Sequence, residues 1–476
     1  MAIEIQTARQ PLSPNDSDSP AGASNLMSYA DQGLFLTLRS MDQESIIQAA
    51  WIYEHPLDEA GLRRFHQNFG YGIAGRSIER SPLPFGRHRW VATPGAPMDI
   101  EFCSPRERSE LMSWLDERAQ LPVDPEWGPG WRIGVLPMTD GSTAVTLTGS
   151  HALGDGIAAS IRVFQAVLGM RTDLGYPPPK SRTRRRAVLA DLRQTYRDLP
   201  DTLRAFAALV RFLYGEWRKS RRTARALPAR PPTPALPAIS ANELQRNVVL
   251  PAVFLTIDVA QWDATARRLG ANGHSLLAGF GARVAQRIGR LGDDGDVTLL
   301  IPISQRDSLD DGRANAVVMA TAKVDPAGIE HDLSGARSAM REAVNKARSE
   351  PDRLAEVMAL VPWLPRRAMR GMADATFGFT ADRPVFCSNV GDMPAEIMRA
   401  DGTDAEYMFI RGIDRRVTRE ALERRSGLLT VMSARAGSTV IMSVVGYEPG
   451  HPNTRDWLRD IVDATLADFG LTGHIE

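Results

Sequence analysis

Residues 144–156, AVTLTGSHALGDG, join a predicted strand to a predicted helix. The run 144–148 is rich in β-branched residues and predicts the strand. The helix follows because apolar residues at 157, 161, 164 and 168 fall on one helical face. Between the two lies a turn with one histidine, one aspartate and several glycines. A strand-to-helix junction of this kind is a place where side chains can project into a cleft.

Two side chains in this turn are candidates for chemistry. His151 can accept and return a proton near neutral pH without a large pKa shift. Asp155 stands at the head of the helix, and Gly154 and Gly156 permit a tight turn and close approach of a ligand. A structural interpretation stays open, because an aspartate before an apolar helix is commonly an N-cap and a histidine at a strand end can simply be packed. A metal site is the weaker hypothesis, because no other His or Cys cluster supplies further ligands.

The surrounding sequence alternates strands with helices. Residues 131–138 and 144–148, around Asp140-Gly141, predict a β-hairpin. Further elements are expected as follows: a first packed segment at 28–38; helices at 58–69, 105–120, 157–168, 275–288, 331–348 and 455–469; strands at 253–257, 297–301, 316–324, 386–390, 428–432 and 438–445. The class is therefore α/β, or α+β with mixed sheets.

Composition narrows the class of protein. The 476 residues suit two domains, and 57 basic side chains balance 57 acidic ones, so no global field favours nucleic acid. Two cysteines, Cys103 and Cys387, are too few for a disulfide framework. No signal-peptide core and no apolar run of transmembrane length is present, so a cytoplasmic protein is expected.

Residues 180–238 differ from the rest. Fourteen basic residues and four acidic ones fall between Lys180 and Arg225, and a proline-rich run at 228–237 follows. We interpret this segment as a crossover between two domains. It is either a solvated charged face or a peripheral contact with an anionic membrane through residues 180–227. The expected organisation is a flexible leader at 1–27, subdomains at 28–179 and 239–476, and the crossover at 180–238.

The sequence resembles the CoA-dependent acyltransferase superfamily, defined by the motif HxxxDG. His151-Ala-Leu-Gly-Asp155-Gly156 matches that motif. Wax ester synthase/diacylglycerol acyltransferase-like proteins and condensation domains look closest. Residues 57–60 (LDEA), 131–133 (WRI), 301–306 (IPISQR) with Asn315, and 387–394 (CSNVGDMP) resemble other segments of that family in the same order.

The resemblance implies two chloramphenicol acetyltransferase-like domains with an active-site tunnel between them. It implies acyl transfer from an acyl thioester, acyl-CoA or acyl carrier protein, with no other cofactor, no metal and no covalent enzyme intermediate. His151 would be the general base, and Asp155 would hold the loop by pairing with an arginine, for which Arg306 is the candidate. Gly156 completes the catalytic motif. Substrate contacts are expected from the following residues: Ser150, Arg306, Asn315, Ser388 and Asn389.

Three departures from the family pattern affect the expected function. Ser150 replaces the first of two histidines, Gly273 replaces an asparagine linked with stabilisation of the intermediate, and residues 388–394 alter the "SNVPGP" segment. Ester formation with an alcohol or lipid acceptor is the first hypothesis. Amide formation by a condensation-type enzyme that uses a carrier-protein-bound donor is the second, and a non-catalytic lipid-binding protein is the third.

Overall fold

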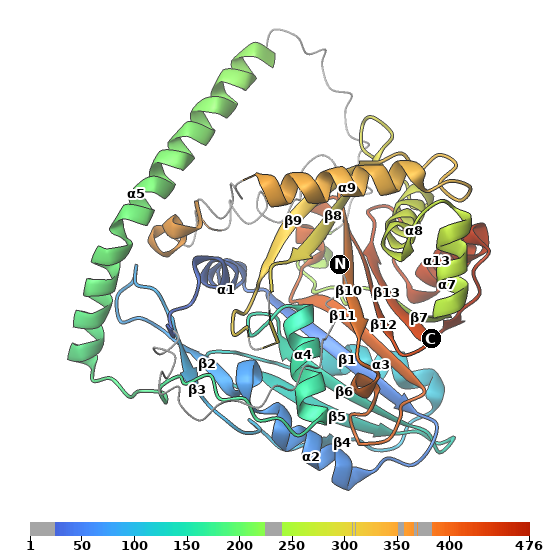
Figure 1. Cartoon of the computed structure of the whole chain (residues 1–476), viewed down its shortest axis with the longest axis horizontal. Coiled ribbons are helices and arrows are strands. Elements are labelled where there is room, and N and C mark those ends of the chain that lie inside the picture. Colours follow the sequence, from blue (N-terminus) through green and yellow to red (C-terminus); the bar gives the residue numbers. More distant parts are fainter. Residues whose placement is uncertain are drawn as a thin grey trace, which may run out of the picture.

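The computed structural model describes residues 24–223, 240–306, 308–309, 311–350, 357–365, 369 and 383–476. Within these residues the chain forms two mixed β-sheets, each covered by helices, and a separate two-stranded hairpin (Figure 1). This arrangement confirms the predicted class, α/β with mixed sheets. Most of the expected leader and the proline-rich run at 228–237 lie outside the described residues.

The first sheet contains strands from both halves of the chain. Its order is β11-β1-β6-β5-β4, and its strands are β1 (Glu44–Tyr53), β4 (Glu101–Phe102), β5 (Trp131–Pro137), β6 (Thr143–Ser150) and β11 (Tyr407–Arg415). All neighbours are antiparallel except β4 and β5. Strand β11 comes from the range expected for the second subdomain, so the late chain completes the early sheet. The exact subdomain boundaries stay a prediction.

Both faces of the first sheet are buried. Successive residues of a strand point to opposite sides, so neighbouring residues of β1 contact different helices. Trp51 and Tyr53 of β1 pack with α2 (Glu59–Phe69) and α4 (Gly156–Val167). Ala50 and Ile52 pack on the other side with α3 (Leu111–Ala119). The HxxxDG turn therefore stands between a central strand and a helix that covers the sheet.

The second sheet has the order β14-β7-β13-β12-β10-β8-β9. Its strands are β7 (Ala252–Asp258), β8 (Val297–Ser304), β9 (Val317–Val324), β10 (Val385–Met393), β12 (Leu428–Ala436), β13 (Thr439–Tyr447) and β14 (His474–Ile475). Strand β10 runs parallel to both of its neighbours, β8 and β12. One apolar core joins this sheet to α7 (Val259–Arg268), α8 (Gly273–Arg287), α9 (Ser334–Ser349) and α13 (Arg455–Phe469).

The remaining helices and the two-stranded hairpin belong to neither of these two sheets. They are α1 (Tyr29–Met41), the hairpin β2 (Arg76–Glu79) and β3 (Arg89–Ala92), α5 (Arg184–Thr223), α6 (Ala241–Leu244) and α12 (Arg419–Arg424). Short 3-10 helices complete the set: η1 (Gly72–Gly75), η2 (Arg108–Glu110), η3 (Met358–Trp363) and η4 (Ala395–Met398). Helix α5 runs along one side of the molecule and extends beyond the first sheet (Figure 1).

Most expected elements are present with shifted ends. The hairpin turns at Gly141, whose φ of 91° is in the region that glycine favours, and the final helix covers the expected residues 455–469. The helix expected at 105–120 is shorter than predicted, because Glu107 and Glu110 cap a 3-10 turn and α3 begins only at Leu111. Strands β1 and β11 and helix α7 were not predicted. No helix in the described part of the chain is both long and apolar enough to cross a membrane.

Candidate active site

His151 is held by the edge of strand β1. Its backbone N–H donates to the carbonyl oxygen of Ser45 at 2.9 Å, which continues the β1–β6 ladder beyond Ser150. The Leu153 N–H donates to the Ser150 carbonyl at 3.0 Å and closes the turn. The position of the imidazole is therefore set by the register of a buried sheet.

Asp155 is the N-cap of α4 and also the centre of a buried polar network. Its Oδ1 accepts from the Ala158 N–H at 2.8 Å, which satisfies a free donor of the first helical turn. Its Oδ2 accepts from the Ala316 N–H at 2.9 Å and from Nη2 of Arg306 at 2.8 Å. Asp155 is therefore the N-cap that the structural interpretation expects, and it also pairs with Arg306, the arginine that the resemblance implies.

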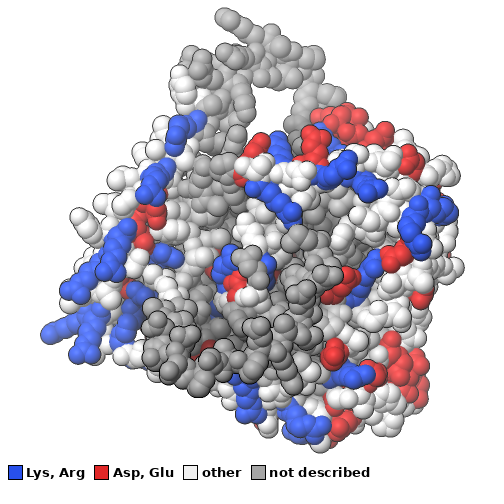
Figure 2. Space-filling model, in the orientation of Figure 1, with Lys and Arg blue, Asp and Glu red and all other residues white. Residues whose placement is uncertain are grey.

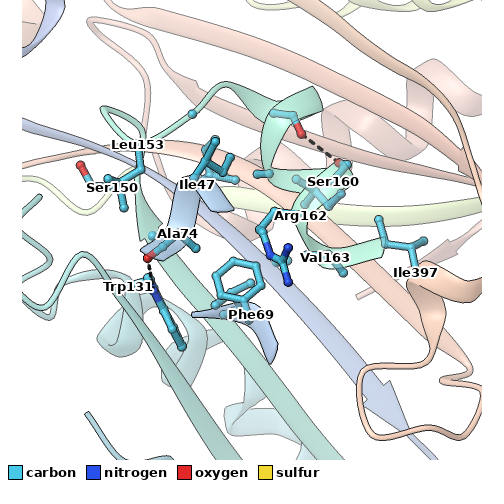
Figure 3. Close-up of a pocket in the computed structure, with 18 of the residues that line it drawn as sticks. Ile47, Phe69, Ala74, Trp131, Ser150, Leu153, Ser160, Arg162, Val163 and Ile397 are labelled. Carbon is cyan, nitrogen blue, oxygen red and sulfur yellow. Dashed lines mark hydrogen bonds between the residues drawn. The ribbon is translucent and has the colours of Figure 1, made fainter. Parts of the chain in front are cut away.

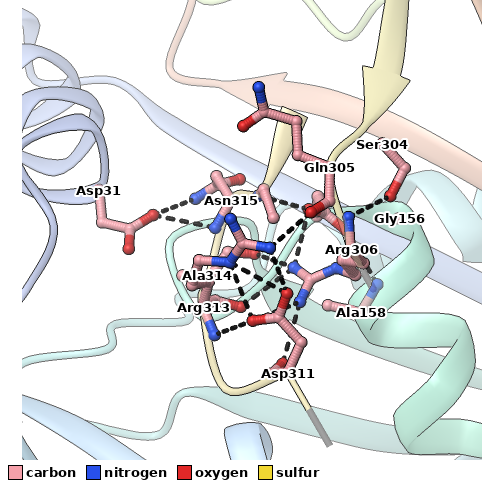
Figure 4. A network of polar contacts seen from close by, with 12 residues as sticks. Asp31, Gly156, Ala158, Ser304, Gln305, Arg306, Asp311, Arg313, Ala314 and Asn315 are labelled. Atoms are coloured by element: carbon pink, nitrogen blue, oxygen red, sulfur yellow. Dashed lines mark hydrogen bonds and ion pairs between the residues drawn. The ribbon is translucent and has the colours of Figure 1, made fainter. Parts of the chain in front are cut away.

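Arg306 ties the HxxxDG turn to the loop after β8 (Figure 4). Its guanidinium is 1% exposed and donates to carbonyl oxygens of Asp311, Arg313 and Ala314 at 2.8–3.0 Å, besides the Asp155 carboxylate. A buried ion pair of this kind is costly to form but very costly to break, because one partner alone leaves a buried charge. The contact therefore fixes the loop and leaves neither group free to bind a substrate.

A second buried arginine, Arg76, supports the same turn. Its Nη2 donates to the Leu153 carbonyl at 2.8 Å, and its Nη1 donates to the Gly312 carbonyl at 2.5 Å. Its guanidinium carbon lies 4.0 Å from the ring centre of Trp90. Burial lowers the pKa of Arg76. The turn around His151 is thus held by two arginines, of which only Arg306 was predicted.

His151 lies in a row with Ser45 and Asp414 across three strands. Ser45 on β1 is the cross-strand partner of Asp414 on β11, and on its other side it accepts the His151 N–H. Residues at one register position point to the same face of a sheet. Burial raises the pKa of Asp414, while the hydroxyl of Ser45 and the charges of Arg425 and His151 act in the opposite direction.

The imidazole of His151 makes no side-chain hydrogen bond within the described residues. Its Nδ1 is buried there and has no partner. Ser45 and Asp414 are the polar side chains that the register places beside it. The sequence analysis predicted neither Ser45 nor Asp414. The apolar run 46–53 could have indicated strand β1, and Ser45 directly precedes that run.

An apolar cavity of about 60 Å³ lies beside the motif, between the first sheet and α4 (Figure 3). Ser150, Leu153 and Gly156 line it from the motif side, and Trp131 and Phe69 line it from β5 and α2. Ser150 accepts the Ala152 N–H through its Oγ at 3.3 Å, so it also supports the turn. His151 is not part of this lining.

One cation, Arg162, borders this cavity. It donates to the carbonyl oxygens of Asn68 and Met170 at 2.6 and 2.9 Å and to Oε1 of Gln165 at 3.0 Å. Desolvation lowers its pKa to about 10. Since carbonyl and amide oxygens surround it, Arg162 is a packed cation of the helix–sheet interface.

The expected substrate residues of the second half lie in two different places. Asn315 donates through its N–H and its Nδ2 to Oδ1 of Asp31 on α1, at 2.9 and 3.1 Å, and so joins α1 to the Arg306 loop. Ser388 and Asn389 lie on β10, and Nδ2 of Asn389 is 2.6 Å from Nδ1 of His274. The next residue, Val390, reaches the motif, because a Cβ on Gly156 would lie 3.8 Å from its Cγ2.

Gly273, the position where the resemblance expects an asparagine, opens helix α8 in a tightly packed place. A Cβ at Gly273 would lie 2.6 Å from Nη2 of Arg435 and 2.9 Å from Nε1 of Trp262, so no larger side chain fits there without a shift. Asn272 is the N-cap of α8 and accepts from the Ser275 N–H at 3.0 Å. His274 therefore takes the polar position that faces Asn389. The part of the chain that the structure describes contains no cluster of three or more metal-ligating side chains.

The chain is similar in fold to solved structures, two of which are an acyltransferase and a condensation domain. Wax ester synthase/diacylglycerol acyltransferase from Marinobacter aquaeolei VT8 aligns with a TM-score of 0.52 and 14% identity, over 93% of this chain and 98% of that one. The first condensation domain of the CDA synthetase aligns with a TM-score of 0.55 and 12% identity, over 94% and 96% of the two chains. The chain has the fold shared by these acyltransferase and condensation structures. This confirms the predicted resemblance at the level of fold.

At these identities the likeness concerns the fold alone. No protein-family model matches the chain, and no curated protein sequence does. The roles of His151, Asp155 and the substrate residues, and the tunnel between the lobes, therefore stay predictions.

Proposed function

We propose that the protein is an acyltransferase that moves an acyl group from an acyl thioester, acyl-CoA, to an alcohol and forms an ester. The observation that carries this proposal is the HxxxDG turn. Its histidine is fixed by the sheet, and its aspartate is held by a buried arginine, at a strand-to-helix junction of this fold. This geometry keeps Asp155 away from the chemistry and leaves His151 for proton transfer.

In the proposed reaction His151 acts through Nε2, since Nδ1 is buried. Nε2 accepts the proton of the acceptor hydroxyl while the oxygen attacks the thioester carbonyl carbon. The C–S bond then breaks, and the imidazolium returns the proton to the leaving thiolate. The enzyme forms no covalent intermediate. Burial raises the pKa of the Cys387 thiol to about 12, so this thiol stays protonated and is a poor nucleophile.

The row Asp414–Ser45–His151 gives the base an electrostatic partner. The imidazole gains a positive charge when it takes the proton. Asp414 in its ionised form would favour that charge, against the burial that raises the pKa of this carboxyl. The Ser45 hydroxyl holds the carboxylate between the strands. Asp414 would thus be a positioning residue that acts through His151.

A second candidate function uses the same site. The alignment with the condensation domain favours amide formation from an acyl group bound to a carrier protein. The third, a lipid-binding protein without catalysis, is favoured by Gly273, which stands where the family has an asparagine that stabilises the intermediate. The proposed partners are an acyl thioester, a small-molecule or lipid alcohol and, for the second candidate, an acyl carrier protein. The proposed location is the cytoplasm, with membrane contact through residues 180–227.

The test is thiol release from a panel of acyl-CoAs with pooled alcohols and amines. Ester products and acceptor-dependent release support the first proposal. Turnover with acylated carrier protein but not with acyl-CoA supports the second. Acyl-CoA binding without turnover, unchanged by His151→Ala, supports the third and contradicts the first.

A further inference from the structure

Helix α5 exposes a large apolar surface. Eight large apolar side chains on it are between 40% and 78% exposed: Leu189, Leu192, Tyr196, Leu199, Leu203, Phe206, Val210 and Tyr214. We call this set the apolar stripe. Single exposed apolar residues are ordinary, but a contiguous patch on a folded protein marks a surface that contacts a partner.

The spacing puts the stripe on one face of the helix. From Leu189 to Val210 the intervals alternate between three and four residues, and Tyr214 follows after four more. Side chains with these intervals lie one above the other along a helix. The stripe is therefore continuous over about seven turns, since each turn takes 3.6 residues.

The opposite face of α5 attaches the helix to the body of the protein. Ala187, Asp191 and Ala205 are buried. The Asp191 carboxylate accepts from Arg89 and Arg182 at 3.0 Å and from the Ser81 hydroxyl at 2.7 Å. These contacts fix the helix on the β2–β3 side and turn the stripe away from the body.

The charge of α5 is strongly positive. The helix contains eleven basic and four acidic side chains. Arg193, Arg197, Arg204 and Arg211 are exposed and follow the stripe along its free side, and we call them the arginine row. Figure 2 shows basic side chains along the edge of the molecule that α5 forms. Only Arg204 of this row is in an ion pair within the described residues, with Asp201.

A second copy of the chain fits this surface less well. Alternating three- and four-residue intervals also occur in coiled coils, where oppositely charged residues beside the seam select the partner. The positions beside the stripe are Val188, Thr195, Thr202 and Leu209 on one side and Arg193, Pro200 and Ala207 on the other. None of these is acidic, so two copies would bring together helices of the same charge with no compensating pair.

We propose that α5 lies flat on an anionic lipid surface, with the apolar stripe inserted at the headgroup boundary and the arginine row on the lipid phosphates. Helices with an apolar face and an arginine-rich polar face bind membranes in this way. Anionic lipid attracts the positive charge of α5, whereas a second copy of the positively charged helix would repel it. The membrane contact proposed above for residues 180–227 would then run through α5, whether or not His151 catalyses acyl transfer.

The test is flotation of the full chain with vesicles of phosphatidylcholine alone or with about 30% phosphatidylglycerol. We expect binding to the anionic vesicles at about 50 mM salt, weaker binding at about 500 mM, and little binding to phosphatidylcholine alone. Absence of binding at low salt overturns the proposal.

Two variants test the two parts of the surface. The triple substitution Tyr196→Ser, Leu203→Ser and Phe206→Ser removes the middle of the stripe, and Arg193→Gln, Arg197→Gln and Arg211→Gln remove most of the row. Each should reduce vesicle partitioning by about tenfold or more. In the arginine variant, vesicle partitioning should also change less with salt concentration than in the wild type. Equal partitioning of the wild type and the stripe variant overturns the proposal.

The matched control is Trp127→Ser, Val249→Ser and Met319→Ser, three side chains of comparable exposure elsewhere on the protein. It should bind vesicles like the wild type. Circular dichroism checks that all variants are folded, which we expect because every substituted side chain is exposed. Analytical ultracentrifugation tests whether a second copy of the chain binds the stripe instead. If the wild type is a dimer, the stripe variant is a monomer and neither binds vesicles, the stripe is a dimer interface and the proposal is overturned.

Discussion

At the scale of single residues, one buried carboxylate holds the HxxxDG turn in place. Asp155 accepts three hydrogen bonds, from Ala158, Ala316 and Arg306, and all three end at one buried carboxylate. Helix capping alone would use one of them. The other two connect the turn to the loop after β8, so the same side chain starts α4 and positions His151.

The first prediction concerns Asp155→Asn. An asparagine can still cap α4, but it removes the carboxylate that the buried Arg306 guanidinium contacts at 2.8 Å and leaves only that of Asp311, at 3.8 Å. We expect the free energy of unfolding to fall by about 3–5 kcal/mol, measured by urea denaturation. The control is Asp293→Asn, an exposed aspartate, which should change stability by less than about 0.5 kcal/mol. Equal midpoints for the wild type and Asp155→Asn would show that the buried pair is not needed for the fold.

The second prediction concerns Asp414→Asn, which removes the charge from the row beside His151. We expect kcat to fall about tenfold, which corresponds to about 1.4 kcal/mol of lost transition-state stabilisation. Asp404→Asn, at an exposed site before β11, is the control. An unchanged kcat in a folded Asp414→Asn would contradict a role for Asp414 beside His151.

At the scale of elements, the sequence predicted those with a clear periodicity. The hairpin β5–β6 was predicted from β-branched runs around Asp140-Gly141, and helix α4 was predicted from an apolar helical stripe. The HxxxDG motif lies directly between β6 and α4. Strands β1 and β11 were missed, since β1 is buried on both faces and shows no alternation. Because these two strands were not predicted, Ser45 and Asp414 were not predicted as neighbours of His151. A cross-strand neighbour can be named only when both strands and their register are known.

The third prediction concerns the contact between α1 and the β2–β3 hairpin. His88 is 6% exposed and packs edge-on against Phe35 of α1. Burial, with a smaller contribution from the charge of Arg80, lowers the pKa of His88 to about 4. The folded protein thus keeps His88 neutral, whereas the unfolded chain protonates it near pH 6.5. Its stabilising contribution is complete above pH 6.5 and is lost as the pH falls to about 4.

The loss should amount to about 3 kcal/mol of the free energy of unfolding, from the difference between the two pKa values. The measurement is urea denaturation of the wild type and His88→Phe between pH 7 and pH 4.5. The variant should lose less stability over this range. Parallel pH curves for the two proteins would contradict a buried neutral His88.

At the scale of the whole molecule, the two sheets share one chain path. Two lobes with mixed sheets were expected from the family resemblance, and the fold confirms them. The motifs did not predict that β11, from the second half of the chain, joins the first sheet. There it pairs with nine residues of β1. Sequence order alone does not show which distant strands pair.

The fourth prediction follows from β11. A fragment of residues 1–238 lacks this strand and exposes the edge of β1 together with apolar residues that β11 covers. We expect the fragment to aggregate or to lack cooperative unfolding, followed by near-UV circular dichroism during heating. The full chain is the comparison. A fragment that unfolds cooperatively on its own would show that the first lobe does not need β11.

Thiol release decides whether His151 is the base of an acyl transfer. The wild type, His151→Ala and the control His331→Ala, whose side chain is 83% exposed, are compared with acyl-CoAs and pooled acceptors. We predict acceptor-dependent release that falls about 10²–10⁴-fold in His151→Ala and stays unchanged in His331→Ala. Equal release by the wild type and a folded His151→Ala would contradict the assignment.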